Sequence, residues 1–387
     1  MRIIDIRELA IPLKSSLRNA VFDFSEMSTS VVAVKTDARR DGKPVIGYAF
    51  NSTGRYACGA QMRERFIPRL LAAPPESLLD ETGENLDPEK ALACMSRREK
   101  PGGHSERSIP IGTIEVAIWD AVAKIAEKPL HDVLARRYGT EAMQQVPCYV
   151  GGGWYEPGKG IPELRDEIQS RLDEGYTTMK IKVGGASLKE DLARVEAAIG
   201  VVGGGRHLAV DANAGFSRTQ CFDYAAALDP YGLRWLEEPT DPIDFATLAE
   251  LTQQYNGAIG SGENLYSTQD VHNLVRFGAM RADRDIIQID VPQSYGIAQF
   301  ARSVAMLESM GWARQSIFPH GGNLMTLAVV TGFGLGGCEA YPGVFGIFAG
   351  FADDARVENG MLRPSDRPGI GFEGQNQLYA VMQSIFA

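Results

Sequence analysis

The feature that most constrains this chain is a regular alternation of short apolar runs and amphipathic stretches, which begins near Pro147. The apolar runs are rich in β-branched and aromatic residues, and each one ends in polar residues. Eight such runs occur, at residues 147–152, 177–183, 207–213, 234–239, 258–265, 286–291, 315–320 and 337–342. Strands that alternate with helices form parallel sheets through right-handed crossovers. Eight evenly spaced strands favour a closed (β/α) barrel, and an open doubly wound sheet is the structural alternative.

The residues before position 128 do not follow that alternation. Strand-like segments come first (RIIDIRELAIPL, STSVVAVKTDA and KPVIGYAF), and helical segments such as GTIEVAIWDAVAKIAEKP follow them. We therefore expect an α+β capping domain at residues 1–128 and a barrel at residues 129–345. The C-terminal segment, residues 346–387, shows no further strand–helix unit and is expected to return to the capping domain. A length of 387 residues fits a barrel of about 250 residues with an accessory domain.

Composition excludes several classes of partner. The net charge is −10 and no basic cluster occurs, so nucleic acid and anionic membranes would be repelled. No apolar run reaches about 18 residues, which argues against a membrane span, and the first residues alternate in polarity instead of forming a signal peptide. The five cysteines form no CxxC pair, so neither a disulfide framework nor a zinc site is expected. These observations favour a cytoplasmic protein that acts on a small molecule.

Three acidic residues end three consecutive predicted strands: Asp211 in VDAN, Glu237 in WLEEP and Glu263 in SGEN. Each of the last two lies 26 residues after the one before, which is one strand–helix unit. In a barrel this register places the carboxylates side by side at the C-terminal mouth, where barrel enzymes hold their active sites. Carboxylates at such short range repel one another unless a cation lies among them. Because all the ligands are oxygens, the sequence predicts Mg²⁺, with Mn²⁺ as the alternative.

Lys180 and Lys182 lie two residues apart on the second predicted strand, so both side chains point to the same face. Strands of a parallel barrel are normally apolar, and burying two ammonium groups is costly. Each charge disfavours the other, which lowers the pKa of one lysine toward the range of a usable general base. Strand-end lysines that reach solvent are the alternative explanation.

His320 ends the seventh predicted strand in SIFPH, and Asp290 lies near the end of the sixth in IIQIDV. From a neighbouring strand, Asp290 can hold one imidazole nitrogen and raise the basicity of the other. The second strand lies across the barrel from the sixth and seventh, so Lys182 and His320 are expected to face a bound substrate from opposite sides. Glu339 on the eighth strand and Asn213, beyond the first metal-site acid, are further polar candidates.

Together these motifs resemble the mandelate racemase group of the enolase superfamily: KIK on the second strand, the three spaced acids, the Asp–His pair and the strand-eight Glu. The resemblance covers essentially the whole chain. It implies an α/β fold, a modified (β/α)7β TIM-type barrel with an α+β N-terminal capping domain completed by the C-terminal segment. It also implies magnesium-assisted acid–base chemistry on a carboxylate, and a homo-oligomer. Within the group the sequence is most similar to the D-tartrate dehydratases.

The resemblance implies a role for each motif residue. The residues carried over as metal ligands are Asp211, Glu237 and Glu263. The residues carried over as catalytic are Lys182, His320, Lys180, Asp290 and Glu339. Among these, Lys180 would tune Lys182, Asp290 would orient His320, and Glu339 would hold the substrate carboxylate. The candidates for substrate binding are Asn213 in the barrel, Asn19 and Lys100 in the capping domain, and Trp154 after the first strand.

The expected activity is that of a hydro-lyase. Lys182 would remove the α-proton of a hydroxy-dicarboxylate and His320 would assist loss of the β-hydroxyl, converting D-tartrate to oxaloacetate and water. Return of the proton to the same carbon would instead give a racemase or epimerase. The capping loops could also select a longer acid sugar, of the galactonate or fuconate type. A Schiff-base aldolase, which would use a barrel lysine without metal, and a non-catalytic acid-sugar binding protein are the remaining alternatives.

Overall fold

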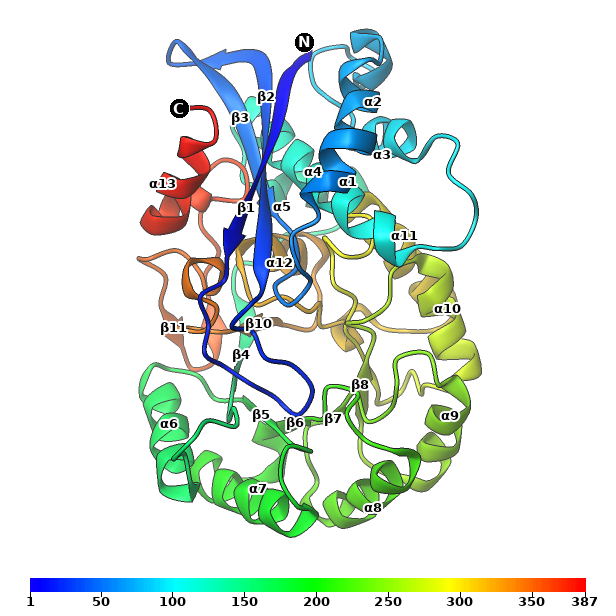
Figure 1. The fold of residues 1–387 in the computed structure, drawn as a ribbon, viewed down its shortest axis with the longest axis vertical. Helices are drawn as coiled ribbons and strands as arrows, with labels where there is room; N and C mark the ends of the chain where they lie inside the picture. The colour runs from blue at the N-terminus through cyan, green and yellow to red at the C-terminus, as the bar shows by residue number, and fades with distance from the viewer.

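A closed barrel of parallel strands forms the lower half of the molecule in Figure 1. The computed structural model describes residues 1–387. Its barrel strands are β4 (Val146–Gly152), β5 (Met179–Lys182), β6 (Leu208–Asp211), β7 (Leu236–Glu237), β8 (Ile259–Ser261), β9 (Ile286–Ile287) and β10 (Cys338–Ala340). Neighbours from β4 to β9 pair in parallel. Ile317 bridges to β9 and supplies the seventh strand position, and β10 pairs with β4, which closes the ring. The predicted barrel is confirmed, and the open sheet is excluded.

Seven helices connect consecutive barrel strands and lie outside the ring. They are α6 (Ile161–Asp173), α7 (Leu188–Val202), α8 (Arg218–Leu228), α9 (Phe245–Gln254), α10 (Thr268–Phe277), α11 (Ile297–Ser309) and α12 (Leu324–Phe333). Five of them begin after a side chain that accepts a hydrogen bond from the first turn: Ser187, Ser217, Asp244, Ser267 and Asn323. Such caps satisfy backbone N–H groups that have no partner inside the helix. They therefore fix where each loop at the barrel mouth ends.

An antiparallel sheet and a set of helices form the capping half of the molecule, above the barrel in Figure 1. The sheet has the order β1 (Ile3–Pro12), β2 (Ser28–Arg40), β3 (Lys43–Phe50). The helices are α1 (Gly59–Gln61), the π-helix η1 (Met62–Phe66), α2 (Ile67–Leu71), α3 (Pro88–Ser96), α4 (Ser105–Ile125) and, toward the barrel, α5 (Leu130–Tyr138). A Cβ on Gly47 would lie 2.1 Å from the carbonyl oxygen of Ala117. Glycine therefore permits β3 to lie directly on α4.

The C-terminal segment contacts both halves. A hairpin of β11 (Val357–Glu358) and β12 (Met361–Leu362) adds to the barrel, because β12 pairs antiparallel with β4. The chain then returns to the capping half, where helix α13 (Asn376–Ser384) lies beside the antiparallel sheet (Figure 1). There Asp120 of α4 accepts a hydrogen bond from the N–H of Ile370, and Lys124 pairs with Glu373. A buried acid and a partly buried lysine thus tie the tail to the cap.

Two loops of the capping half reach down onto the barrel mouth, one between β1 and β2 and one after β3 (Figure 1). The first is held by the N–H of Tyr155, which donates to the carbonyl oxygen of Arg18. The second is held by Ser52, whose hydroxyl donates to Asp290 over 2.7 Å. The space between these loops and the C-terminal strand ends is where the predicted site residues gather.

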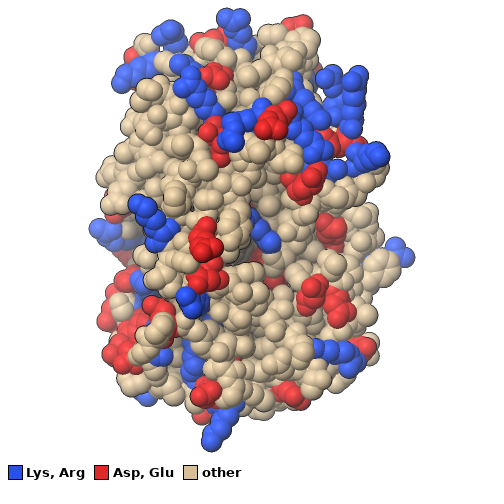
Figure 2. All heavy atoms as spheres, viewed as in Figure 1, with Lys and Arg blue, Asp and Glu red and all other residues tan.

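The outer surface carries charges of both signs. On the face shown in Figure 2, Lys and Arg side chains are interspersed with Asp and Glu side chains over the cap and the barrel. This agrees with the absence of a basic stripe in the sequence. None of the helices is both long and apolar enough to cross a membrane.

Candidate active site

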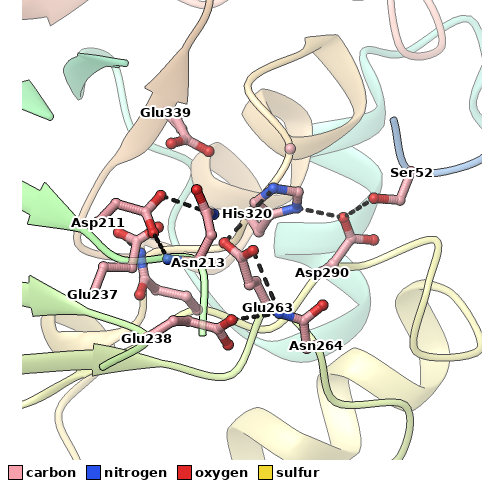
Figure 3. Close-up of polar contacts among 12 residues, drawn as sticks. Ser52, Asp211, Asn213, Glu237, Glu238, Glu263, Asn264, Asp290, His320 and Glu339 are labelled. Carbon is pink, nitrogen blue, oxygen red and sulfur yellow. Dashed lines mark hydrogen bonds and ion pairs between the residues drawn. The ribbon is translucent and has the colours of Figure 1, made fainter. Parts of the chain in front are cut away.

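Three buried carboxylates meet at the barrel mouth (Figure 3). Asp211 and Glu237 are the last residues of β6 and β7 and are paired in register, and Glu263 follows β8. One carboxylate oxygen from each residue lies within 4.8 Å of the others. The three side chains are at most 9% exposed. The spacing of one strand–helix unit in the sequence therefore becomes direct proximity in space, as the barrel register requires.

This cluster suits a hard divalent cation. All ligands are carboxylate oxygens, which Mg²⁺ and Mn²⁺ prefer. Three further acceptor oxygens around the site are buried without a hydrogen-bond partner: Glu238 Oε1, Asn213 Oδ1 and Glu339 Oε2. Buried acceptors that lack a donor are costly unless a cation or a ligand meets them. Burial raises the pKa of Glu237 to about 8 despite its lysine neighbour, so ionising the whole cluster requires added positive charge.

The two lysines of β5 point into the barrel and share Asp211, whose Oδ2 also lies 3.4 Å from Lys180 Nζ. Lys180 Nζ lies 2.5 Å from Glu237 Oε1 and 2.5 Å from Glu339 Oε1. Lys182 Nζ lies 2.5 Å from Asp211 Oδ2. Burial opposes the charge of Lys180, but Glu237 and Glu339 outweigh it and raise its pKa well above the ordinary value. The electrostatic field at Lys180 thus comes mainly from carboxylates. From the sequence alone, only the repulsion between the two lysines could be considered.

His320 follows the seventh strand position and is held by Asp290, as Figure 3 shows. The distance from His320 Nδ1 to Asp290 Oδ2 is 2.8 Å, and His320 Nε2 lies 3.9 Å from Glu263 Oε2. Asp290 also accepts from the hydroxyl of Ser52 and from the N–H of Gln293. Burial disfavours the imidazolium, yet Glu263 and Asp290 raise the pKa of His320 to about 10. The imidazole is therefore oriented on one side and free to meet a ligand on the other.

A small cavity lies between the cap loops and these residues. Lys182 and His320 line it from strand positions that are not neighbours, together with Glu263 and Asn213. Lys180, Asp211, Glu237, Glu339 and Asp290 lie behind this wall. Tyr341 donates to Glu339 Oε1, so that acid is bonded on one oxygen and has no partner on the other. The arrangement brings one amine and one imidazole to the same cavity, beside the carboxylate cluster.

The three capping and loop candidates differ in position. Asn19 and Trp154 line the cavity. Asn19 Oδ1 accepts from the N–H groups of Val21 and Phe22, which shapes the loop over the site. The indole of Trp154 lies under the Lys182 ammonium at 4.7 Å, and its buried N–H has no partner. Lys100 is exposed and does not line the cavity, so the structure does not bring it together with the other candidates.

Several cavity residues were not predicted from sequence. Those from the cap are Phe22, Phe24, Ser52, Thr53, Gly54 and Arg55, and those from the barrel half are Asn264, Gln293, Tyr341 and Phe345. The cap residues lie in loops that carry no periodic or motif signal, because only their contact with the barrel gives them a place in the site. Glu238 could have been found from the sequence, since it follows Glu237 in WLEEP. In the structure its carboxylate accepts a hydrogen bond from Asn264, the residue after Glu263.

Comparison with known proteins identifies the family of this chain. Residues 163–378 match the family model "Enolase C-terminal domain-like". The chain is 29% identical over 373 residues to a 3,6-anhydro-alpha-L-galactonate cycloisomerase from Streptomyces coelicolor, covering 95% of this chain and 94% of the relative. It is 28% identical over 361 residues to an arabinonate dehydratase from Saccharolobus solfataricus, covering 91% and 90%.

The fold comparison points the same way. A crystal structure of a racemase from Streptomyces coelicolor with bound magnesium superposes with a TM-score of 0.77 at 26% identity, covering 97% of this chain and 99% of that one. The family match spans the barrel strands from β5 onward and includes all three acids of the cluster. This chain belongs to the enolase C-terminal domain-like family.

Proposed function

We propose that this protein is a magnesium-dependent dehydratase of a hydroxy-carboxylate, with the metal held by Asp211, Glu237 and Glu263. The observation that carries the proposal is the position of Lys182 and of His320, which line one cavity from strands that are not neighbours, beside the carboxylate cluster. Two relatives with matching length are named for reactions of acid sugars. The unpartnered buried acceptors around the cluster support the presence of a cation.

Lys182 is the base that removes the α-proton. An α-proton beside a carboxylate is too weak an acid for a free amine at neutral pH. Magnesium, when bound, supplies the positive charge that stabilises the enediolate. Lys182 must be neutral to act as base, and its ammonium is paired with Asp211, one of the three residues that would hold the metal. Lys180 stays between Glu237 and Glu339 and keeps a fixed positive charge under the substrate carboxylate.

His320 is the acid that protonates the leaving β-hydroxyl. Its Nδ1 is bonded to Asp290, so its Nε2 is the nitrogen that can give a proton to the departing β-hydroxyl. The α C–H and β C–O bonds break, a C=C bond forms, and water leaves with the proton from His320. The enol product then becomes a 2-keto acid. In each turnover Lys182 gains one proton and His320 loses one. The next turnover therefore needs only the transfer of a proton from Lys182 to His320 through solvent.

The substrate we propose is a short hydroxy-dicarboxylate, with D-tartrate and its product oxaloacetate as the first pair to test. A longer acid sugar of the galactonate or fuconate type is the alternative within the same chemistry. The test is a screen of the Mg²⁺-loaded protein against mono- and dicarboxylic sugar acids, including the three tartrates, for 2-keto acid formation. A strong signal on one acid, lost with a chelator, supports the proposal. Absence of keto acid from every acid contradicts it.

Racemisation or epimerisation is the second candidate, because two acid–base groups that approach from different sides can also exchange the proton at one carbon. Incorporation of deuterium from D₂O at the α-carbon without keto acid formation identifies that reaction. A Schiff-base aldolase is disfavoured because both lysines are paired with buried carboxylates. Reduction with borohydride that traps substrate on Lys182, with activity that survives a chelator, would support the aldolase instead.

A further inference from the structure

The cavity has two chemically different walls on its cap side. Phe22, Phe24 and Phe345 form an apolar wall around Trp154. The other wall is polar and is formed by the loop after β3 together with side chains that follow β8 and β9. Arg55 is the one ionisable side chain that the capping half contributes to the cavity. A substrate bound beside the carboxylate cluster therefore meets a single positive charge from the capping half.

Arg55 is held rigidly by neutral partners. Its Nε donates to Gln293 Oε1 over 2.7 Å, and its Nη2 donates to Asn264 Oδ1. Its guanidinium also lies over the ring of Tyr266 at 5.6 Å. No Asp or Glu pairs with it, and its Nη1 makes no hydrogen bond. A guanidinium fixed at two nitrogens, with its charge and a third nitrogen free, is arranged to bind a planar anion.

The supports of Arg55 connect it to the metal site. Gln293 Nε2 donates to the carbonyl oxygen of Glu263 over 2.6 Å. Asn264 is the next residue after Glu263 and donates to Glu238. The guanidinium is thus positioned by the same loops that carry a metal-site carboxylate. Gly54, with φ of 91°, gives the turn that directs Arg55 inward, a conformation that favours glycine.

We propose that Arg55 binds the second carboxylate of a short dicarboxylic substrate and selects such acids over monocarboxylic sugar acids. This inference rests on the proposed function for the reactive end of the substrate. The first carboxylate lies at the metal end, near Lys180 and Lys182, and the second meets Arg55. A monocarboxylic acid places a hydroxymethyl group there, which leaves the arginine charge unpaired in a partly buried cavity. Charge pairing at the second carboxylate therefore sets specificity.

The test compares chain-matched ligands on the Mg²⁺-loaded protein. Succinate and butyrate have the same carbon chain and no hydroxyl groups, so calorimetric binding reports the second carboxylate alone. We expect Arg55→Gln to weaken succinate binding by about 10- to 100-fold and to leave butyrate binding unchanged, because charge-assisted hydrogen bonds are lost. Arg63→Gln is the matched control, since Arg63 is a cap arginine that pairs with Glu8 away from the cavity. Arg63→Gln should leave the binding of both ligands unchanged.

Turnover provides the second readout. The Arg55→Gln variant should lower kcat/KM for tartrate by about 10- to 100-fold, and kcat/KM for the monocarboxylic arabinonate and galactonate by much less. Equal losses for both classes, or equal effects of Arg55→Gln and Arg63→Gln, overturn the inference. If the wild-type protein dehydrates only monocarboxylic acids, the dehydratase proposal is supported and the role of Arg55 is contradicted. If no acid is dehydrated but succinate binding depends on Arg55, the role of Arg55 stands and the dehydratase proposal falls.

Discussion

At the residue scale, the proposed chemistry depends on two side chains that reach the cavity separately, Lys182 and His320. We expect Lys182→Ala and His320→Asn each to lower kcat by about 10²- to 10⁴-fold, the usual contribution of a general acid or base. Removing Lys182 also removes the closer of the two lysines that pair with Asp211 Oδ2, so magnesium should bind to that variant as well as or better than to wild type. Steady-state kinetics and calorimetry with Mg²⁺ check both statements. Near-normal turnover in either variant contradicts the assignment.

Ser52 links the cap to the acid–base pair and provides a second prediction at this scale. Its hydroxyl donates to Asp290 Oδ2, the same oxygen that holds His320 Nδ1. We expect Ser52→Ala to lower kcat by about tenfold through a less well oriented imidazole, with less change in KM. Asp290→Asn should cost more than Ser52→Ala, because it removes the acceptor charge itself. Ser52→Thr keeps the hydroxyl and should restore most of the activity; no rescue by threonine argues against the role.

The site residues that were predicted from the sequence and those that were not differ in what determines their position in the site. Asp211 and Glu237 end strands, and a parallel barrel converts equal spacing in sequence into contact in space. Arg55 and Ser52 lie in a loop whose position depends on where the cap docks, and no local pattern encodes that docking. Lys100 shows the same limit, because it was carried over by resemblance and lies exposed outside the cavity.

At the element scale, one buried acid of the cap determines how a barrel helix begins. Helix α11 has no capping side chain of its own at Gly296. Instead Glu115 of α4 accepts from the N–H groups of Ile297 and Ala298, at 2.8 and 2.9 Å. It also accepts from the indole N–H of Trp119. The cap thus supplies a helix N-cap in trans, which fixes the loop after β9 that carries Asp290.

We therefore expect Glu115→Ala to destabilise the protein by about 2–4 kcal/mol, because three buried donors lose their acceptor. The change should appear as a lower urea midpoint and, since the loop after β9 loosens, as a lower kcat. Glu106→Ala on the same helix is the control, because Glu106 pairs with Arg65 at the surface, where ion pairs contribute little. An equal loss of stability in the two variants contradicts the trans-capping role.

The elements themselves were predictable to different degrees. Each apolar run from residue 147 onward contains a strand or a bridge, because buried parallel strands need continuous β-branched residues. After β4 the strands are shorter than the runs, and the seventh is reduced to the bridge at Ile317, since polar residues leave the ladder at the mouth. The β11–β12 hairpin was not predicted, because it adds two-residue strands to the outside of β4 and leaves almost no periodic signal.

At the scale of the whole molecule, metal binding at the carboxylate cluster should stabilise the fold. Asp211, Glu237 and Glu263 bring three carboxyl groups within 4.8 Å of one another, and a bound cation favours their ionised forms. A ligand that binds only the folded state at about 100 times its Kd adds about 2.7 kcal/mol. We expect Mg²⁺ to raise the melting temperature by a few degrees and a chelator to reverse the rise. Sodium chloride at equal ionic strength should not substitute, and Glu263→Gln should reduce the shift.

Buried phenols and thiols predict a loss of stability in alkali. Burial raises the pKa of Tyr48, Tyr176 and Tyr255 above the ordinary value, and raises the pKa of Cys58 and Cys148 to about 12. For each group the folded state holds its proton more tightly than the unfolded state. Stability from these groups is therefore complete below the unfolded pKa, about 8.5 for Cys and about 10 for Tyr, and is lost as pH rises toward the folded pKa.

The loss should reach about 1.4 kcal/mol per pH unit for each group that ionises only on unfolding. The urea midpoint should therefore be flat near about pH 8 and fall steeply above about pH 10, the range in which unfolded tyrosine titrates. Tyrosinate absorbance should rise together with loss of the circular dichroism signal, because phenols that are buried across the cap and the barrel ionise when the chain opens. If the phenols ionise while the fold and the urea midpoint persist, the buried tyrosines are accessible to hydroxide and do not set the alkaline limit.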